Sequence, residues 1–487
     1  MLKRNTKSKA AARAKDRKKK GGKKPLFNRK HKGIIQINVP YFKWKLRVFW
    51  KLCAVSLIAW FLVINHYEHI AVKHALNKCA WDRWEHWPTD PTVPKKKQHV
   101  DSHKVALFAD PQIMDKHSYP NRPWIVNYVT QILVDHYHKR NWRYVQYHLK
   151  PQTNFFLGDL FDGGSYWDDD YWMKEYNRFN EIFPKKPETR TVMSLPGNHD
   201  IGFGDTIVES SLDRFAAYFG PTSSSIDVGN HTFVLVDTIS LSDRTNPNVS
   251  DVPRQFLNNW TRQAHPYPRI LLTHVPLYRN PEVQTCGKQR ESHKKFPIQK
   301  GVQYQTVIDS DLSQEVLAKV QPSFVFSGDD HDYCHIKHSY TTPRNTIAET
   351  EEITVKSCAM NMGISRPAIQ LLSLHNDGAA PGSPTMQTQI CYLPDPYSPI
   401  WAYIAMAVCN FLGMVWYLAK FDKVKGARIA DYKDKGELPL PVSADSKAEK
   451  SKLRKKRFKT LLNDVNVNLN VIVTLLGYIF MYYYKCL

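Results

Sequence analysis

The sequence has few cysteines, and none of them shows the spacing of a metal-binding finger. Only eight cysteines occur in 487 residues, so a zinc-finger protein is excluded. The chain is instead long enough for one large catalytic domain with accessory segments. Its 42% of hydrophobic residues are enough for a packed core, which makes a globular enzyme possible.

Acidic residues are almost missing from the first 51 residues, which contain 19 Lys and Arg and one acid, Asp16. Residues 420–460 contain 14 basic and six acidic residues, whereas residues 52–419 contain 34 basic and 37 acidic ones. The net charge of +23 therefore belongs to two flanking blocks, and the central part is not basic. This distribution argues against a nucleic-acid-binding enzyme. The first block has too little apolar surface to fold, and its expected role is attraction to anionic lipid.

Three segments are apolar enough to suggest membrane helices. Residues 48–64 are apolar apart from Lys51, and about 17 to 25 such residues span a hydrocarbon core. They lie too far from the start of the chain for a cleaved signal peptide, so we interpret them as a signal anchor. Residues 400–419 have the required length, with lysines directly after them. Residues 465–484 are interrupted by asparagines, so a helix at the membrane interface is the alternative to a third span.

The two basic blocks fix the expected topology, because positive charge marks the cytoplasmic side of a membrane. Both blocks can face the cytoplasm only if the domain between them lies outside it. We therefore expect a disordered cytoplasmic tail (1–47), an anchor (48–66), a lumenal linker (67–103), a catalytic domain (104–375), a linker (376–399), a span (400–419), a cytoplasmic loop (420–464) and a probable third span (465–484).

The central domain has features that suit a secretory-pathway lumen. Asn230, Asn248 and Asn259 each begin an N-glycosylation tripeptide. Five cysteines fall on the expected lumenal side, namely Cys79, Cys286, Cys334, Cys358 and Cys391. An oxidising compartment would permit one or two disulfides among them, but the odd number leaves the connectivity open.

Between residues 103 and 375, short apolar runs repeatedly end in polar residues at a turn. The runs are KVALFADPQ, TNFFLGDLFDGG, TVMSLPGNHD, HTFVLVDTISL, RILLTHVPL and PSFVFSGDDHD. Continuous apolar runs predict strands that are buried on both faces, with helical stretches between several of them. In layered α/β folds, ligands bind at the carboxyl ends of such strands.

The residues at these ends are of the types that bind divalent cations. They comprise three carboxylates, two amide oxygens and two imidazoles: Asp110, Asp159, Asp329, Gln112, Asn198, His274 and His331. Seven such ligands would serve two cations with one shared carboxylate. A pair of metals is the usual device for hydrolytic displacement at phosphorus.

The pattern resembles the calcineurin-like metallophosphoesterase superfamily, whose motifs are D-x-H, G-D, G-N-H-D/E, H and G-H-x-H. Within it, ADPQIMDKHSYP, FFLGDLFDGG, SLPGNHDIGFG, CGKQRE, GVQYQ and FSGDDHDYC look like the fungal cell-division-control type of manganese-linked phosphodiesterase, which removes ethanolamine phosphate from GPI glycans. The resemblance implies a four-layer α/β/β/α sandwich with two or three membrane helices.

The resemblance also implies roles for the site residues. One metal would be held by Asp110, Gln112, Asp159 and His331, and the other by Asp159, Asn198, His274 and Asp329. A hydroxide held by the metals would attack phosphorus. His199 would assist the leaving oxygen and would be oriented by Asp200.

Two positions depart from the superfamily pattern. Gln112 and Asp329 stand where histidines are expected, so each replaces a nitrogen ligand with oxygen. We infer that this favours Mn²⁺ over Zn²⁺.

Other residues near the motifs have two interpretations each. Asp162 either polarises a metal ligand or caps a turn. The aromatic residues Tyr166, Trp167, Tyr171 and Trp172 either stack on sugar or lipid or, as we prefer, pack in the core or face the membrane. Arg279 and Arg290 either bind a second phosphate or, preferably, form salt bridges.

His335 and His338 are expected to be structural, because the Gly328-to-His331 frame selects His331 as the ligand. Cys334 is expected to be buried or in a disulfide rather than catalytic.

The leading hypothesis is a Golgi or endoplasmic-reticulum phosphodiesterase that acts from the lumenal side on a GPI lipid or GPI-anchored protein. A phosphatase of another phospholipid or phosphoprotein is the second hypothesis. The third is a manganese-homeostasis membrane protein with a non-catalytic metal site, which His199 argues against because metal storage has no use for it. The reaction class comes from the residues, and the substrate comes from the resemblance alone.

Overall fold

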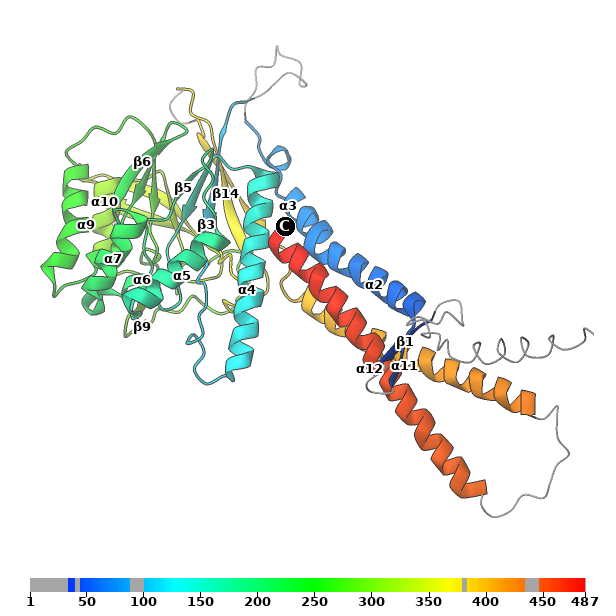
Figure 1. Ribbon diagram of the computed structural model, residues 1–487. Coiled ribbons are helices and arrows are strands. Elements are labelled where there is room, and N and C mark those ends of the chain that lie inside the picture. The colour runs from blue at the N-terminus through cyan, green and yellow to red at the C-terminus, as the bar shows by residue number, and fades with distance from the viewer. Residues whose placement is uncertain (1–33, 40–43, 88–99, 379–382, 434–445, 487) are drawn as a thin grey trace, which may run out of the picture. The chain divides into compact units, whose positions relative to one another are not determined.

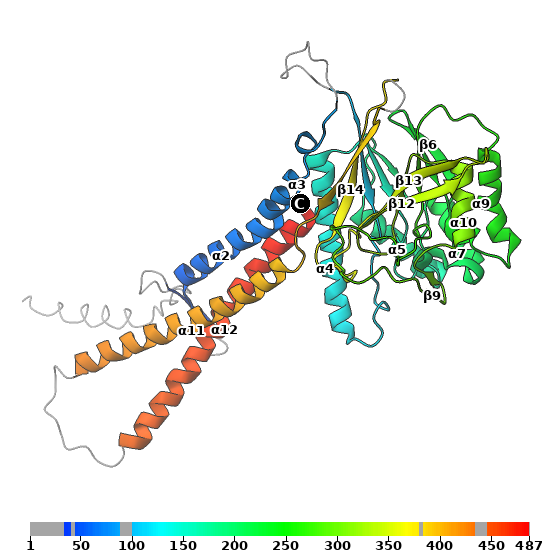
Figure 2. The ribbon, with the colours of Figure 1, turned by 180° about the vertical axis from the view of Figure 1, so that it is seen from behind.

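The computed structural model describes residues 34–39, 44–87, 100–378, 383–433 and 446–486 (Figures 1 and 2). They divide into two compact units. One unit joins the segment before Asn65 to Trp401–Cys486, and the other is Asn65–Ile400. The second unit contains all of the motifs expected to bind metal.

The first unit is built around three long helices. They are α2 (Trp50–Asn65), which continues without a break as a helix to Asn77, α11 (Ser398–Lys433) and α12 (Ser446–Cys486). Each contains a stretch long and apolar enough to cross a membrane, within Trp50–Asn77, Ser398–Lys423 and Ser451–Tyr483. At most 28% of the residues in each apolar window are buried, so these helices are not enclosed like core helices. All three segments expected to span are therefore helices that could do so.

The asparagine-rich start of the third segment is explained by a buried contact. The side chain of Asn468 is fully buried, accepts a hydrogen bond from the Phe49 N–H at 2.8 Å and donates to the Arg47 carbonyl at 3.0 Å. Arg47 in turn donates to Asp464 at 3.0 Å. These polar groups are satisfied by protein and need no water.

The flanks of the spans are more ordered than expected. A hairpin of β1 (Ile35–Val39) and β2 (Trp44–Val48) occupies the end of the expected disordered tail, because the two strands pair along their length. The expected loop at 420–464 is helical at both ends, where α11 and α12 extend beyond their apolar parts. Residues 1–33, 40–43 and 434–445, which make up the rest of those two segments, lie outside the described residues.

The second unit contains two large sheets and one short two-stranded sheet. The five-stranded sheet has the order β15-β14-β3-β4-β5, and the six-stranded sheet has the order β12-β13-β11-β8-β7-β6. The strands are β3 (His103–Phe108), β4 (Thr153–Phe156), β5 (Arg190–Val192), β14 (Ala368–Leu374), β15 (Met386–Tyr392), β6 (Ser224–Val228), β7 (His231–Leu235), β8 (Arg269–Leu272), β11 (Phe324–Ser327), β12 (Cys334–Thr341) and β13 (Ile347–Thr354). The central strands pair in parallel, β3 with β4 and β8 with both β7 and β11.

Alternate residues of these strands face opposite layers. Val105 and Leu107 of β3 share a core with Phe233 of β7, and the Phe155 and Phe233 rings stack across the two sheets with centroids 4.5 Å apart. Phe108, on the other face of β3, packs against α4 (Trp124–Tyr144) and α5 (Asp169–Ile182). The outer face of the second sheet packs against α9 (Pro247–Trp260) and α10 (Ser310–Val320). The expected four-layer α/β/β/α sandwich is therefore confirmed (Figure 1).

Parts of the two expected linkers, 67–103 and 376–399, belong to this folded unit, so the expected limits of the catalytic domain at 104 and 375 were wrong. In the first, Cys79 forms a disulfide with Cys391, and the Trp87 indole N–H donates to Ser373 at 2.9 Å. In the second, β15 pairs along its whole length with β14. A covalent cross-link and a strand ladder thus extend the folded unit beyond residues 104–375. Residues 88–99 and 379–382 lie outside the described residues.

Candidate metal centre

The expected metal ligands follow the ends of four central strands. Strands β3 and β4 run parallel, as do β8 and β11, so the loops of each pair leave from the same edge. Two or three residues beyond each strand end lie Asp110, Asp159, His274 and Asp329, respectively. The ligand atoms of Asp110, Asp159 and His274 lie within 4.8 Å of one another, which is close enough for a shared cation.

The backbone at this edge adopts an unusual conformation. Five of the seven expected ligands have a positive φ: Asp110 (47°), Gln112 (36°), Asp159 (50°), Asp329 (65°) and His331 (63°). Residues other than glycine rarely adopt this left-handed region, and each instance costs about 1 to 3 kcal/mol. Such conformations cluster where function fixes the geometry, and here the surrounding fold imposes them on the ligands themselves.

Two glycines allow the loops to approach each other. A Cβ atom on Gly197 would lie 2.0 Å from Asp159 Oδ1, and one on Gly158 would lie 2.5 Å from His274 Nδ1. Gly158 also has a φ of 95°. The glycines of the GD and GNHD motifs are therefore needed for packing of the metal loops.

His274 is oriented toward the oxygen ligands by a backbone carbonyl. Its Nδ1 lies 2.6 Å from the Leu157 oxygen, which fixes Nδ1 as the protonated nitrogen and leaves Nε2 as a ligand. Nε2 lies 3.3 Å from both Asp159 Oδ1 and Asn198 Oδ1. It is 3.6 Å from Asp329 Oδ1. This is the second of the two expected ligand sets, and the structure brings all four members together.

The charges around His274 create a site of high negative charge. Burial alone would lower the pKa of His274, but Asp159 and the other carboxylates raise it to about 10. Burial raises the pKa of Asp329 to about 7 and raises that of Asp110 well above its usual range. Burial is the main cause of these raised carboxyl pKa values, the His274 imidazole opposes it, and repulsion from Asp159 adds a smaller contribution. Cations would relieve this repulsion.

Three buried oxygen atoms support the presence of metals directly. Within the described part of the chain, Asp110 Oδ2, Gln112 Oε1 and Asp329 Oδ2 are buried without a hydrogen-bond partner. Leaving such atoms unpaired costs about 1 to 3 kcal/mol each, and hard divalent cations prefer these oxygen types as ligands. The residues therefore fit a divalent metal centre.

The remaining ligands of the first expected set lie around the same loops. The Gln112 N–H donates to the Asp159 carbonyl at 2.8 Å, which joins the two loops. Asp110 Oδ1 accepts from the Asp329 N–H at 3.0 Å. Burial lowers the pKa of His331 to about 4, with a smaller opposing effect from Asp159, so its ring is neutral and able to bind metal at neutral pH.

His199 lies beside the ligands, and its side chain is partly exposed. Its backbone N–H donates to Asp159 Oδ1 at 3.0 Å, and 39% of its side chain is exposed. Its ring Nδ1 lies 2.7 Å from the Asp162 carbonyl oxygen and 3.6 Å from the Asp162 carboxylate. Burial would lower the pKa of His199, but Asp159 and Asp162 outweigh it and raise the pKa. The raised pKa favours the protonated form of the His199 imidazole, which is the form that can donate a proton.

Asp200 does not orient His199, contrary to expectation. Its carboxylate instead accepts hydrogen bonds from the backbone N–H groups of Gly197 (2.8 Å), Phe161 (3.0 Å) and Leu160 (3.2 Å). These three amides hold the Asp200 carboxylate, which thereby joins the loop that carries Asp159 to the loop that carries Asn198. The residue that orients His199 is Asp162, through its backbone carbonyl, and this role differs from both interpretations given for Asp162 above.

Three of the four expected substrate-binding residues have other roles. Arg279 is 2% exposed and pairs with Glu352 at 3.0 Å, while Arg290 pairs with Asp330. Trp167 is buried in the core. Only Tyr166, which is 63% exposed, is accessible to a ligand. Arg279 and Arg290 form salt bridges and Trp167 packs in the core, in agreement with the preferred interpretation of each residue.

The histidines that follow His331 are structural, as expected. His335 pairs with Glu351 at 3.0 Å on the surface. His338 is buried and pairs with Glu352 at 2.6 Å. Both belong to β12 and lie on its opposite faces, His335 on the exposed face and His338 on the buried one.

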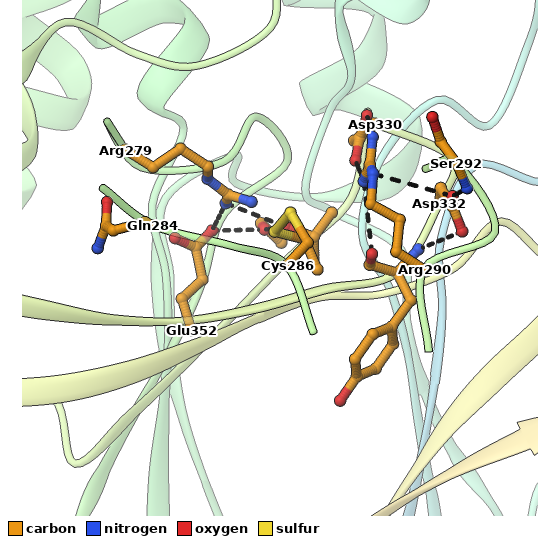
Figure 3. The surroundings of a disulfide bond; sticks show 12 residues. Arg279, Gln284, Cys286, Arg290, Ser292, Asp330, Asp332 and Glu352 are labelled. Atoms are coloured by element: carbon orange, nitrogen blue, oxygen red, sulfur yellow. Dashed lines mark hydrogen bonds and ion pairs between the residues drawn. A yellow bond between two sulfur atoms is a disulfide. The ribbon is translucent and has the colours of Figure 1, made fainter. Parts of the chain in front are cut away.

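The ligand loop after β11 is supported from outside the metal centre (Figure 3). Cys334 forms a disulfide with Cys286, and Arg290 binds the Asp330 carboxylate between the two expected ligands Asp329 and His331. The buried ammonium group of Lys356 donates to Asp332 at 2.9 Å. The CGKQRE motif thus supports the ligand loop.

Sequence reasoning missed the contribution of Gln303. Its carbonyl oxygen accepts from the Asn198 side-chain amide at 3.2 Å, which turns the Asn198 oxygen toward His274. Gln303 has a φ of 54°, and it joins two short paired strands, β9 (Lys300–Gly301) and β10 (Tyr304–Gln305). The GVQYQ motif was visible in the sequence, but a backbone contact made across 105 residues leaves no local signal.

The fold and the site together define a metal-dependent phosphoesterase. The model of the calcineurin-like phosphoesterase family matches residues 103–333. The chain is 55% identical to cell division control protein 1 of Saccharomyces cerevisiae, over 90% of this chain and 92% of that one. It is 28% identical to metallophosphoesterase 1 of Gallus gallus, over 41% of this chain and 54% of that one. The chain therefore belongs to the calcineurin-like metallophosphoesterase family and is a hydrolase of phosphoesters that uses divalent metal ions.

Proposed function

We propose that the enzyme is a phosphodiesterase that removes ethanolamine phosphate from a mannose of a GPI-anchor glycan. The observation that supports a phosphodiester hydrolase is the cluster of Asp110, Asp159 and His274, whose ligand atoms lie within 4.8 Å of one another, with His199 hydrogen-bonded to Asp159. The choice of glycan rests on the resemblance of the extended motifs. The products would be free ethanolamine phosphate and a mannose hydroxyl, with water adding to phosphorus.

Bound cations would supply the Lewis acidity that activates water and offsets charge on the phosphate oxygens. The protein residues have separate tasks. Asp162 holds the His199 ring through Nδ1, so Nε2 is the nitrogen left to donate a proton to the mannose oxygen. The exposed fraction of the ring is consistent with contact to a large glycan.

We propose Mn²⁺ as the metal. Among the seven expected ligands, only His274 and His331 offer nitrogen, and the three unpartnered buried atoms are all oxygens. An oxygen-rich set suits harder ions better than Zn²⁺. Metal content and activity of the purified chain, reconstituted with Mn²⁺ or Zn²⁺, test this assignment; tighter binding and faster turnover with Zn²⁺ would overturn it.

We propose that the catalytic unit lies in the lumen of the Golgi or endoplasmic reticulum, with the N-terminus in the cytoplasm. Two disulfides within this unit, Cys79–Cys391 and Cys286–Cys334, suit an oxidising compartment. The acceptor residues Asn230, Asn248 and Asn259 are candidates for glycosylation. Glycosidase treatment of the chain from cells should increase its mobility in a gel, and Asn→Gln variants should identify the modified sites.

The substrate is tested with a GPI glycan that carries ethanolamine phosphate on mannose. The full chain should release ethanolamine phosphate, and in ¹⁸O-labelled water the label should enter that product. Release of free ethanolamine, or hydrolysis only of phosphate monoesters, would favour a different phosphatase. In cells that lack the protein, mass spectrometry should detect GPI glycans with additional ethanolamine phosphate; an unchanged number would reject this substrate.

His199→Ala separates catalysis from metal storage. This variant should lose turnover while keeping the metal content of the parent chain, because the His199 ring is not among the expected ligands. Retention of the cellular function by His199→Ala would support a non-catalytic metal protein instead.

A further inference from the structure

The first half of α4 presents an apolar face to the surroundings of the catalytic unit. The exposed residues recur in pairs four positions apart, which places them on one side of the helix. They are Trp124 (76% exposed), Ile125 (48%), Tyr128 (54%), Val129 (47%), Ile132 (42%) and Leu133 (39%). Isolated apolar side chains are normal on protein surfaces, but a continuous face of six large ones marks an interaction site.

The buried side of the same helix mixes apolar and polar residues. Val134, Tyr137 and Trp142 join the hydrophobic core, whereas Asn127 and Asp135 are buried polar residues. Asp135 accepts two hydrogen bonds from Arg178, at 2.6 and 2.7 Å, and Asn127 donates to the Tyr119 carbonyl at 2.9 Å. The helix therefore carries large apolar side chains on its exposed side as well as on its packed side. An exposed apolar face of this size suits an external partner.

The middle of α4 is bound to the helical segment that continues α2 from His66 to Asn77. Glu68 lies three residues after the end of α2 and accepts from His136 at 2.8 Å and from Arg140 at 2.9 Å. The Tyr137 hydroxyl donates to the Pro394 carbonyl at 2.8 Å, four residues before α11 begins. Both connections from the catalytic unit to candidate membrane helices therefore contact α4 within one helical turn.

We propose that the exposed face of α4 lies in the interfacial layer of the same lipid bilayer and docks the catalytic unit on the membrane. The segment after α2 and the segment before α11 both contact this helix. Trp124 and Tyr128 are of the types that prefer the level of lipid headgroups, and the aliphatic residues beside them suit the acyl boundary. The only acid in α4 is Asp135, which is buried against Arg178, so no exposed carboxylate of this helix opposes an anionic membrane.

This docking would set the position of the active site relative to a lipid-linked phosphoester. The loop at 113–123 connects the expected ligand Gln112 directly to Trp124. Asn127 fastens the loop to α4, and Ser118 of the loop forms a side-chain hydrogen bond with Asp162. The same short loop therefore touches the residue that orients His199 and leads into the membrane-facing helix. The inference holds for any membrane-borne substrate and does not depend on the GPI glycan.

Fluorescence quenching in the full chain tests the contact. Cysteine is introduced at Ile125 or Val129, labelled with an environment-sensitive fluorophore and reconstituted in phospholipid vesicles with some phosphatidylserine. Ile347→Cys is the matched control, because Ile347 is 81% exposed on β13 in the same unit. The chain without introduced cysteine gives the background from its native thiols.

The labels on α4 should emit at shorter wavelength than the control, lose intensity with lipids that carry a quencher, and resist iodide in the water. The label at position 347 should emit at longer wavelength, keep its intensity with quencher-bearing lipids and be quenched by iodide. Equal iodide quenching at all positions would overturn the proposal. Protection from iodide without quenching by lipid would also overturn it, because the face would then be covered by protein.

A functional test uses Ile125→Asp combined with Val129→Asp, both at exposed positions. Hydrolysis of a vesicle-borne phosphoester should fall, while hydrolysis of a small soluble phosphoester should be unchanged. Circular dichroism and the unaltered soluble activity show that the variant is folded. Equal activity of the parent and the variant on vesicles would contradict a docking role.

Discussion

The carboxylate of Asp200 accepts a hydrogen bond from the Phe161 N–H at 3.0 Å, although the neighbouring His199 was expected to be its partner. Together with the bonds from Leu160 and Gly197, this contact joins the loop after β4 to the loop after β5. Each loop carries an expected metal ligand, Asp159 and Asn198. Asp200 is therefore a positioning residue that keeps the two ligands in register.

Asp200→Asn should weaken the metal centre. The asparagine side chain has the same shape as that of Asp200, but an NH₂ group replaces one acceptor oxygen. Two donors, this NH₂ group and a backbone N–H, would then face each other. Loss of a buried charged acceptor costs about 1 to 3 kcal/mol of unfolding free energy. Thermal unfolding and metal titration should both show the loss, while the pH dependence of the remaining kcat should keep its parent shape. A shifted pH profile with intact metal affinity would restore the expected role beside His199.

The buried pair of Arg279 and Glu352 makes stability depend on acid. Burial alone would raise the pKa of Glu352, but Arg279 and His338 hold it below its ordinary value. The pair therefore stabilises the fold fully above the unfolded pKa of about 4.3, and this contribution is lost as the pH falls through the lower folded value. Glu352→Gln should flatten the decrease in stability below about pH 4.3, measured by denaturant unfolding at several pH values.

A single and a double variant isolate the pair from the rest of the molecule. Arg279→Met leaves Glu352 buried without its cation, which should cost about 3 to 5 kcal/mol. Arg279→Met with Glu352→Gln should recover part of that loss, because no unpaired charge is then buried. If the two variants were equally unstable, the ion pair would not be the cause.

Sequence reasoning predicted the buried strands and the cluster of ligands from local signals, whereas the four-layer sandwich was implied by the family resemblance. Apolar runs identified strands, and the ends of parallel strands meet at one edge, so Asp110, Asp159, His274 and Asp329 could be placed together from the sequence alone. The roles of Asp200 and Gln303 depend on contacts between distant segments. An aspartate that accepts three amide hydrogens and one that orients a histidine look alike in a sequence.

The domain edges and the face of α4 were missed for a similar reason. Strand β15 is partly polar on its exposed side, and only its ladder with β14 and the Cys79–Cys391 disulfide assign it to the folded unit. In α4, both faces contain apolar residues, so periodicity does not show which side is buried. Burial alone reveals that polar Asn127 and Asp135 point inward.

Gln112→His should change the metal preference. Gln112 contributes a buried amide oxygen with no partner among the described residues, in a backbone conformation that histidine tolerates. An imidazole at this position adds a nitrogen ligand, which favours Zn²⁺ relative to Mn²⁺. Competitive metal binding followed by elemental analysis should show an increased Zn²⁺ to Mn²⁺ ratio. Gln112→Ala is the control, and it should weaken binding of one of the two ions without reversing the preference.

The disulfide between Cys286 and Cys334 should matter for metal binding more than the one between Cys79 and Cys391. Cys334 lies three residues after the expected ligand His331, and the Cys286 segment also supplies Arg290 to Asp330 (Figure 3). Replacing either pair of cysteines with alanine should cost about 2 to 4 kcal/mol of unfolding free energy. Only the Cys286→Ala, Cys334→Ala variant should lose metal affinity, because only its cross-link supports the ligand loop. Isothermal titration with Mn²⁺ compares the two variants, and an equal loss of affinity in both would indicate a general effect of reduced stability.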